Sequence, residues 1–214
     1  MYTQRCVAVG VLTIGLAPFP GLSGPRCRDY SDQRRRADPM PKTVRLIGPD
    51  EGQENCMVKE HTANVGVISD THGLLRPEAI RALGKPDLIV HAGDIGSPQV
   101  LETLRALAPV IAVRGNNDAG RWADALPVFE EAQIGQVTLF VIHDIKQLKL
   151  DAPDLKVQVV ISGHSHRPSI QNKGGLIFLN PGSAGPRRFK LPVSVARIRI
   201  VGKQITARTI ELHV

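Results

Sequence analysis

The chain has 214 residues, of which 42% are hydrophobic, 22% are charged and 4% are aromatic. This length and apolar content exclude a disulfide-stapled miniprotein and a wholly disordered chain, and they suffice for one sizeable core. The formal net charge of +7 favours a polyanionic partner, such as nucleic acid or a phosphorylated substrate.

The first 56 residues differ in composition from the rest of the chain. They hold 8 basic and 6 acidic residues, all three cysteines and six of the 16 prolines, whereas all seven histidines come later. An apolar run over residues 7–16 is too short to span a bilayer, and no convincing cleavage site follows it. The cysteine spacing matches no thiolate metal site. We expect residues 1–56 to be a poorly ordered extension that is untranslated or dispensable, and the alternative is a targeting segment. The body of the protein is then expected over residues 57–214.

The first half of the body alternates strands with helices. Short apolar runs predict strands over residues 65–69, 88–91 and 110–113. Apolar residues at helical spacing predict helices over residues 77–83 and 98–107, and a proline stands where the first turn of each would begin. This alternation is typical of a parallel sheet with right-handed crossovers.

The second half of the body reads as hairpins and edge strands. Predicted strands over residues 128–134 and 137–142 flank a Gly-Gln turn, and those over 169–173 and 176–179 flank a Gly-Gly turn. A further strand is predicted over residues 157–162, after a polar stretch with room for one helical turn, and alternating residues mark strands over 193–209. The expected fold is a single α/β domain with a mixed two-sheet core and outer helices.

Side chains able to bind metal follow five of the predicted strands, at the end where open α/β sheets place their ligands. A single such motif is weak, but five at strand ends are hard to obtain from loop composition alone. In chain order they are Asp70 and His72, Asp94, Asn116, His143, and His164 with His166.

These motifs resemble those of the calcineurin-like metallophosphoesterase superfamily, specifically its small bacterial and archaeal phosphodiesterases. The resemblance covers residues 65 to about 212. It implies a four-layer α-β-β-α sandwich, in which two mixed β-sheets are flanked by helices. It also implies a phosphoric ester hydrolase in which a metal-bridging hydroxide attacks the phosphate in line, with no covalent intermediate.

The same resemblance implies two divalent metal ions as cofactors. Asp70, His72 and His166 would hold the first ion, Asn116, His143 and His164 the second, and Asp94 would bridge them. A bridging position suits a carboxylate, because a neutral imidazole presents only one lone pair. Imidazole and carboxylate ligands without thiolate suit Mn²⁺, Fe, Ni²⁺ or Zn²⁺, and we expect Mn²⁺.

One position departs from the wider superfamily. Where many members have a histidine that helps to protonate the leaving group, directly after the ligand asparagine, this chain has Asn117. Asparagine cannot act as a general acid. We therefore expect a preference for diesters or activated leaving groups over alkyl monoesters.

Other polar residues have expected roles around these motifs. His91 is predicted to be buried, and His61 and His213 to be exposed. Asp118 and Asp144 each have two open interpretations, either holding the ligands in place or capping a loop. The turn over residues 180–183 is expected to shape a loop facing the site, with Ser183 and Arg187 near the substrate, and Trp122 to form a substrate rim or an oligomer contact.

The resemblance implies a small phosphodiester substrate. We also expect a cytoplasmic protein with no membrane partner, and a homo-oligomer stays open. Nucleic acid is disfavoured, because the late basic residues, from Arg187 to Arg208, are interleaved with only one aromatic and are expected to form a solvated outer face. The alternatives are a nuclease and a non-catalytic binding scaffold, since the family resembles a subunit of retromer.

Overall fold

The computed structural model describes residues 61–148, 157–188 and 190–214. Contacts divide the chain into a unit of residues 1–41 and a unit of residues 42–214, and everything described below belongs to the second. The predicted extension and its boundary after residue 56 therefore lie outside the described residues. Within the described part, none of the helices has the length and apolar character that a membrane crossing needs.

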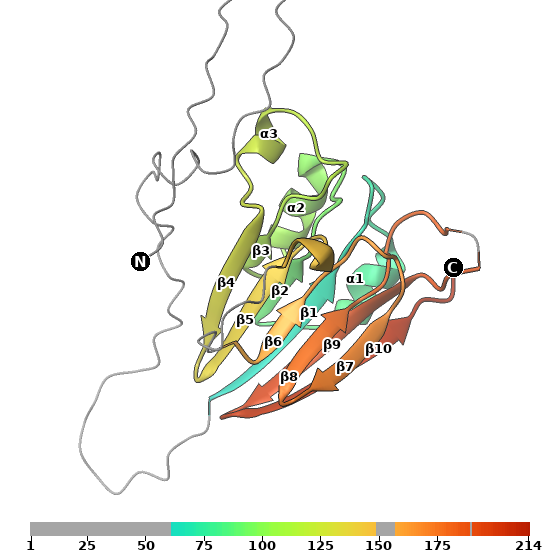
Figure 1. Ribbon diagram of the computed structural model, residues 1–214. Coiled ribbons are helices and arrows are strands. Elements are labelled where there is room, and N and C mark those ends of the chain that lie inside the picture. Colours follow the sequence, from blue (N-terminus) through green and yellow to red (C-terminus); the bar gives the residue numbers. More distant parts are fainter. Residues whose placement is uncertain (1–60, 149–156, 189) are drawn as a thin grey trace, which may run out of the picture. The chain divides into compact units, whose positions relative to one another are not determined.

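Sheet A contains the predicted parallel core. Its strand order is β10-β9-β1-β2-β3, with β1, β2 and β3 parallel and with β9 antiparallel to both β1 and β10 (Figure 1). The crossovers contain the two predicted helices, each with proline in its first turn. The bounds are β1 Thr62–Ile68, α1 Pro77–Leu83, β2 Leu88–His91, α2 Pro98–Arg105, β3 Val110–Ala112, β9 Ser194–Val201 and β10 Gln204–Glu211.

Sheet B contains both predicted hairpins. Its strand order is β4-β5-β6-β8-β7, in which β4–β5 and β7–β8 are antiparallel and β5, β6 and β8 are parallel. Gly135 and Gly174 adopt the positive φ values, 58° and 60°, that tight hairpin turns require. The bounds are α3 Arg121–Asp124, β4 Phe129–Ile134, β5 Val137–Ile142, the 3₁₀ turn η2 Ile145–Gln147, β6 Val159–Ile161, β7 Ser169–Lys173 and β8 Leu176–Asn180.

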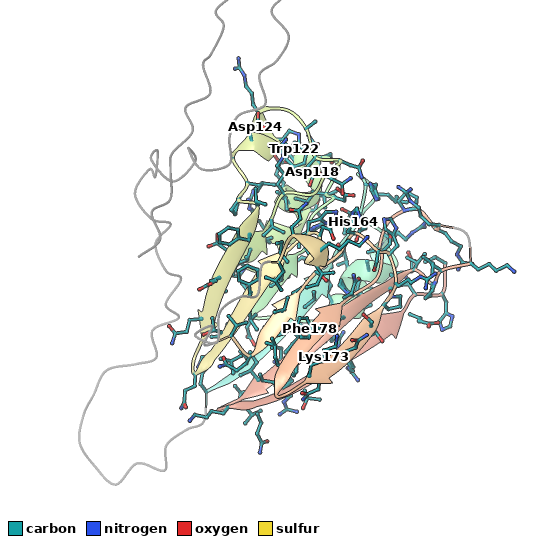
Figure 2. The ribbon with its side chains drawn as sticks, viewed as in Figure 1. Asp118, Trp122, Asp124, His164, Lys173 and Phe178 are labelled. Atoms are coloured by element: carbon teal, nitrogen blue, oxygen red, sulfur yellow. The ribbon has the colours of Figure 1, made fainter. Side chains whose placement is uncertain are left out.

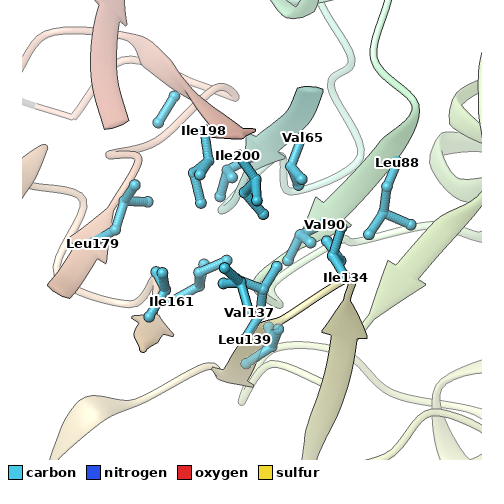
Figure 3. Close-up of a cluster of buried hydrophobic side chains, with 14 of the residues drawn as sticks. Val65, Leu88, Val90, Ile134, Val137, Leu139, Ile161, Leu179, Ile198 and Ile200 are labelled. Atoms are coloured by element: carbon cyan, nitrogen blue, oxygen red, sulfur yellow. The ribbon is translucent and has the colours of Figure 1, made fainter. Parts of the chain in front are cut away.

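The main core lies between the two sheets (Figure 3). Strand alternation builds it: in β9, Ile198 and Ile200 are buried in this core, while Val195 packs on the other side of the sheet with α1 and α2. Each large aliphatic side chain removed from water in this way contributes about 1.5–3 kcal/mol. The two mixed sheets of the predicted sandwich are therefore confirmed.

The helical layers differ between the two sheets. Both α1 and α2 pack on the outer side of sheet A through buried residues such as Leu83 and Leu104. On sheet B, the helical structure within the described residues is η2, and Leu148 at its end packs against a small cluster that includes Phe140 and Val160. The predicted single turn after β5 is thus present.

Candidate metal centre

The seven predicted ligands stand on five loops at one edge of the two sheets. Backbone hydrogen bonds tie these loops to each other: Asp70 N donates to Gly93 O at 3.0 Å, and Gly163 N donates to His143 O at 3.0 Å. The parallel strands make this possible, because their carboxyl ends meet at one edge. In Figure 2, His164 lies toward this end, whereas Lys173 and Phe178 lie farther down the strands.

Five of these seven residues have left-handed backbone conformations. The φ values are 54° at Asp70, 47° at His72, 53° at Asp94, 65° at His164 and 57° at His166. Among the described residues, no other non-glycine residue has a positive φ. Each such conformation costs roughly 1–2 kcal/mol, and backbone strain of this kind concentrates at functional sites.

The first cluster joins the loops after β1 and β6. One nitrogen or oxygen from each of Asp70, His72 and His166 lies within 4.8 Å of the others, and Asp70 Oδ1 is 3.2 Å from His166 Nε2. The other oxygen of Asp70 accepts hydrogen bonds from Ser69 Oγ at 2.5 Å and His164 N at 3.2 Å. Asp70 Oδ1 is buried and accepts none.

The second cluster joins the loops after β3, β5 and β6. Asn116 Oδ1 lies 3.0 Å from His143 Nε2 and 2.9 Å from His164 Nδ1. The other ring nitrogen of His143, Nδ1, is 2.7 Å from Ala92 O and donates to that carbonyl, so in the neutral form of the ring Nε2 offers its lone pair to the cluster, whereas in the protonated form Nε2 donates to Asp94. The amide oxygen of Asn116 and the two imidazole nitrogens therefore lie close enough together to bind one cation.

Asp94 stands between the two clusters. Its Oδ2 atom is 3.9 Å from His72 Nε2 in the first and 3.5 Å from His143 Nε2 in the second. Burial opposes ionisation of this carboxyl, but hydrogen bonds from His143 and Asn117 outweigh it and hold the pKa of Asp94 well below its usual value. The carboxylate is thus charged and available to both clusters at once.

Two histidines respond differently to this surrounding charge. Burial lowers the pKa of His72 despite the nearby carboxylates, which keeps its imidazole neutral as a metal ligand must be. For His143, burial is outweighed by the hydrogen bond to Asp94, which raises its pKa. A proton and a metal ion would therefore compete at His143.

Asn117 has a role that its sequence position did not reveal. Its backbone N donates to Asp94 Oδ1 at 2.8 Å and its side-chain Nδ2 donates to Asp94 Oδ2 at 2.6 Å. Both oxygens of the carboxylate between the clusters are therefore oriented by this one residue. The backbone donor depends on loop geometry, which no motif in the sequence encodes.

Asp118 ties the loops after β2 and β3 together. It is buried, and its two oxygens accept from Gly96 N at 2.8 Å and from Gly115 N at 2.9 Å (Figure 2). Of its two open interpretations, holding the ligand loops is the observed one. Asp144 instead accepts from Lys146 N at 3.0 Å and caps η2.

The turn after β8 supports the ligand loops from below. Asn180 Nδ2 donates to Gly163 O at 2.6 Å, and Ser183 Oγ donates to Asp70 O at 3.0 Å. Ser183 is buried and bonded to the backbone beneath the first cluster. This turn therefore shapes the site loops as expected, with Ser183 as a support.

Two glycines allow the loops to approach so closely. A Cβ on Gly93 would lie 2.6 Å from His143 Nδ1, and a Cβ on Gly115 would overlap Asp94. Each glycine directly precedes a candidate ligand, so the Gly-Asp and Gly-Asn pairs in the sequence reflect this crowding.

The other histidines and the arginine expected near the substrate lie at different depths in the structure. His91 is fully buried, as predicted, and its Nε2 is 2.9 Å from Thr71 Oγ1, while His61 and His213 are exposed. Arg187 reaches Val214 O at 3.3 Å, and it is Arg188 that approaches the first cluster, with Nη2 3.5 Å from His72 Nε2.

Trp122, on α3, is partly buried against the core on the helix side of sheet A. Its indole therefore has a packing role in the described structure. The predicted contact with a substrate or a second copy stays a prediction.

Comparisons with known proteins agree with this geometry. The family model of the calcineurin-like phosphoesterase superfamily domain matches residues 64–203. A probable metallophosphoesterase from Methanothermobacter thermautotrophicus is 38% identical over 158 residues, which cover 68% of this chain and 91% of that protein.

Two solved structures share the fold. One is a novel archaeal phosphodiesterase, with a TM-score of 0.58 and 23% identity, covering 69% of this chain and 99% of its own. The other is Vacuolar Protein Sorting 29 from Cryptosporidium parvum, with a TM-score of 0.58 and 20% identity, covering 72% of this chain and 99% of its own. At these identities the likeness concerns the fold alone.

Proposed function

The chain belongs to the calcineurin-like phosphoesterase superfamily, and we propose that it is a phosphodiesterase whose centre holds two divalent metal ions. The observation that best supports this proposal is the place of Asp94, whose Oδ2 faces His72 at 3.9 Å and His143 at 3.5 Å. The proposed ligands are Asp70, His72 and His166 for the first ion, Asn116, His143 and His164 for the second, and Asp94 for both.

The carboxylate, imidazole and amide atoms of these seven residues are of the kinds that bind such ions. Asp70 Oδ1 is buried without a hydrogen-bond donor, which is costly unless a cation binds there. His143 Nε2 faces Asn116 Oδ1 at 3.0 Å, so once His143 is deprotonated two lone pairs meet where a cation would join them. Imidazole, carboxylate and amide ligands suit Mn²⁺, Fe, Ni²⁺ or Zn²⁺, and we propose Mn²⁺.

The chain's own residues have defined tasks in this proposal. When bound, two such ions lower the pKa of water and stabilise charge on the phosphoryl oxygens. The loops hold the ligands in fixed positions through Asp118 and Asn180. Arg188, on the rim beside His72, adds a cation that attracts the phosphate.

Asn117 supports a preference for diesters. Its two donors are engaged by Asp94, so it orients that carboxylate and offers no proton to a leaving group. Substrates whose leaving group departs without protonation should therefore react faster than alkyl monoesters.

Activity measurements on the purified chain test this proposal. The Mn²⁺-loaded protein should hydrolyse bis(p-nitrophenyl) phosphate faster than an unactivated alkyl monoester, and Asp94→Ala should abolish both activities. Equal rates on the two substrates would overturn the diester preference. Reloading metal-stripped protein with Mn²⁺, Fe²⁺, Ni²⁺ or Zn²⁺ in parallel tests the choice of metal.

The alternatives have weaker support. A binding scaffold needs no metal ligands, whereas all seven candidate ligands are present here and face one another. For a nuclease, the late basic residues offer charge without the aromatic side chains on which bases stack. We therefore propose a small phosphodiester as substrate, and location in the cytoplasm stays a prediction.

A further inference from the structure

A cavity lined by cationic and apolar residues lies toward the end of sheet A that is opposite the candidate metal centre. It has a volume of about 470 Å³ and is bordered by β1, β9, β10 and the segment between α1 and β2. Strand β1 leads from Asn64 at this cavity toward Asp70, and six residues at about 3.3 Å each put these two residues at most about 20 Å apart. The cavity is therefore separate from the metal centre.

Four cationic side chains line this cavity, and no acidic residue does: Lys85, Arg197, Arg199 and Arg208. The strand register explains why they gather. Arg197 pairs with Arg208, and Arg199 pairs with Thr206, so all of them project from the outer face of β9 and β10. Within the described residues, none of the four cations has a carboxylate partner within salt-bridge distance.

Arg197 anchors the cationic group. It is partly buried, and its Nε donates to Ala82 O at 2.6 Å, near the C-terminal end of α1. A Cβ on Gly84 would lie 2.5 Å from Arg197 Nη2, so the glycine leaves room for this guanidinium. The guanidinium is thus fixed before any ligand arrives, which reduces the entropy cost of binding.

The neighbouring carboxylate of Asp87 forms no ion pair with these cations among the described residues. Asp87 follows the lining residue Pro86, and its Oδ2 accepts from Asn64 N at 2.7 Å and from Asn64 Nδ2 at 3.4 Å. The arginines and Lys85 keep their charge available, and like charges around one cavity repel each other until an anion binds.

We propose that this cavity binds a small anion with two or more phosphate groups. Guanidinium groups bind phosphate through paired N–H donors. A cluster of several guanidinium groups therefore suits an anion with several negative charges better than an anion with one carboxylate. The volume lies in the range of small-molecule sites. The walls contain no aromatic side chain for base stacking, which disfavours single-stranded nucleic acid.

Calorimetric titration of the full chain with pyrophosphate tests this site. The double variant Arg199→Gln/Arg208→Gln should lose at least tenfold in affinity for one class of pyrophosphate sites. The control Arg105→Gln/Lys173→Gln changes the net charge equally at exposed positions outside the cavity and should keep that affinity. Hydrolysis of an aryl diester, which reports on the distant metal centre, should be unchanged in both.

Three outcomes would overturn the proposal. Equal affinity in wild type and the cavity variant would exclude the site, and equal losses in both double variants would show a general charge effect. A single-stranded oligonucleotide that binds through Arg199 and Arg208, with no binding of pyrophosphate, would identify a nucleic-acid surface. Circular dichroism checks that the variants are folded, and pyrophosphate should raise the melting temperature of wild type more than that of the cavity variant.

Discussion

The two clusters of the candidate centre differ in their exposure to solvent. In the first, Asp70 is fully buried and His166 is 9% exposed. In the second, Asn116 and His164 are exposed and only His143 is buried. The first cluster is therefore part of the core as well as part of the site, whereas the second is the side that faces solvent and substrate.

Because of this difference in burial, substitutions in the two clusters should differ in their effect on the stability of the fold. Asp70 is bonded to neighbouring loops, and Thr71 beside it is bonded to the buried His91, so changes here should affect folding. His164 makes its side-chain contact with Asn116 at the surface. Changes there should affect metal binding and hydrolysis while leaving the fold nearly as stable.

The largest effect is expected at the residue shared by both clusters. Asp94→Ala should lower kcat/KM for an aryl diester by about three orders of magnitude or more, because both ions lose a ligand. Steady-state kinetics measure this loss. Asp124→Ala is the matched control, since its exposed carboxylate pairs only with Arg114 among the described residues, and it should stay near wild type. An Asp94→Ala protein with a tenth of wild-type activity would contradict the bridging role.

Comparison of Asp70→Ala with His164→Ala tests the difference in burial directly. Each should reduce activity about a hundredfold, but in chelator Asp70→Ala should lower the free energy of unfolding by about 2 kcal/mol, because Ser69 Oγ and His164 N lose the carboxylate that accepts their hydrogen bonds. His164→Ala should cost less than about 1 kcal/mol, as is usual for exposed positions. Urea denaturation measures both values, and equal losses would contradict the assignment of the buried cluster.

The pH dependence of stability should reveal the histidine behind the buried cluster. Burial lowers the pKa of His91 to about 4, from 6.5. The unfolded chain binds this proton more readily, so stability is full above pH 6.5 and falls as the pH drops toward 4. Between pH 7 and pH 5, His91 alone should contribute a loss of about 2 kcal/mol.

Urea denaturation in chelator at both pH values checks this figure. His91→Asn should show a clearly smaller loss over the same range. His213→Asn, at an exposed histidine, should retain the wild-type loss. A His91→Asn protein with an unchanged pH dependence would contradict the role given to His91.

The smallest expected effect concerns backbone strain in the open cluster. Because His164 has a φ of 65°, His164→Gly should be more stable than His164→Ala by about 1 kcal/mol. Both variants should lose about a hundredfold in activity. Thermal denaturation in chelator compares them, and a less stable glycine variant would show that this conformation carries no strain.

Much of the fold could be predicted because the sequence patterns are local. The bounds of α1, β2, β5 and β7 agree with those expected, and the alternation at residues 193–209 becomes β9 and β10. The short helix α3 was not predicted, since four residues after a glycine give too short a pattern.

The residues of the candidate metal centre could be predicted from the sequence, but the hydrogen bonds that hold them in place could not. The ligands could be found because each follows a strand end. The hydrogen bonds from Asn117 to Asp94 and the choice between Arg187 and Arg188 depend on loop conformations, which are set by contacts distant in sequence. The left-handed conformations have the same origin, because aspartate and histidine adopt them more often than most residues but still in a small minority of cases.

Metal analysis of the purified chain by mass spectrometry tests the two-cluster centre most directly. Wild type should hold two divalent ions per chain, and His164→Ala should keep one, in the buried cluster, with its diesterase activity lost. Full diesterase activity in a chain that holds one ion or none would contradict the account.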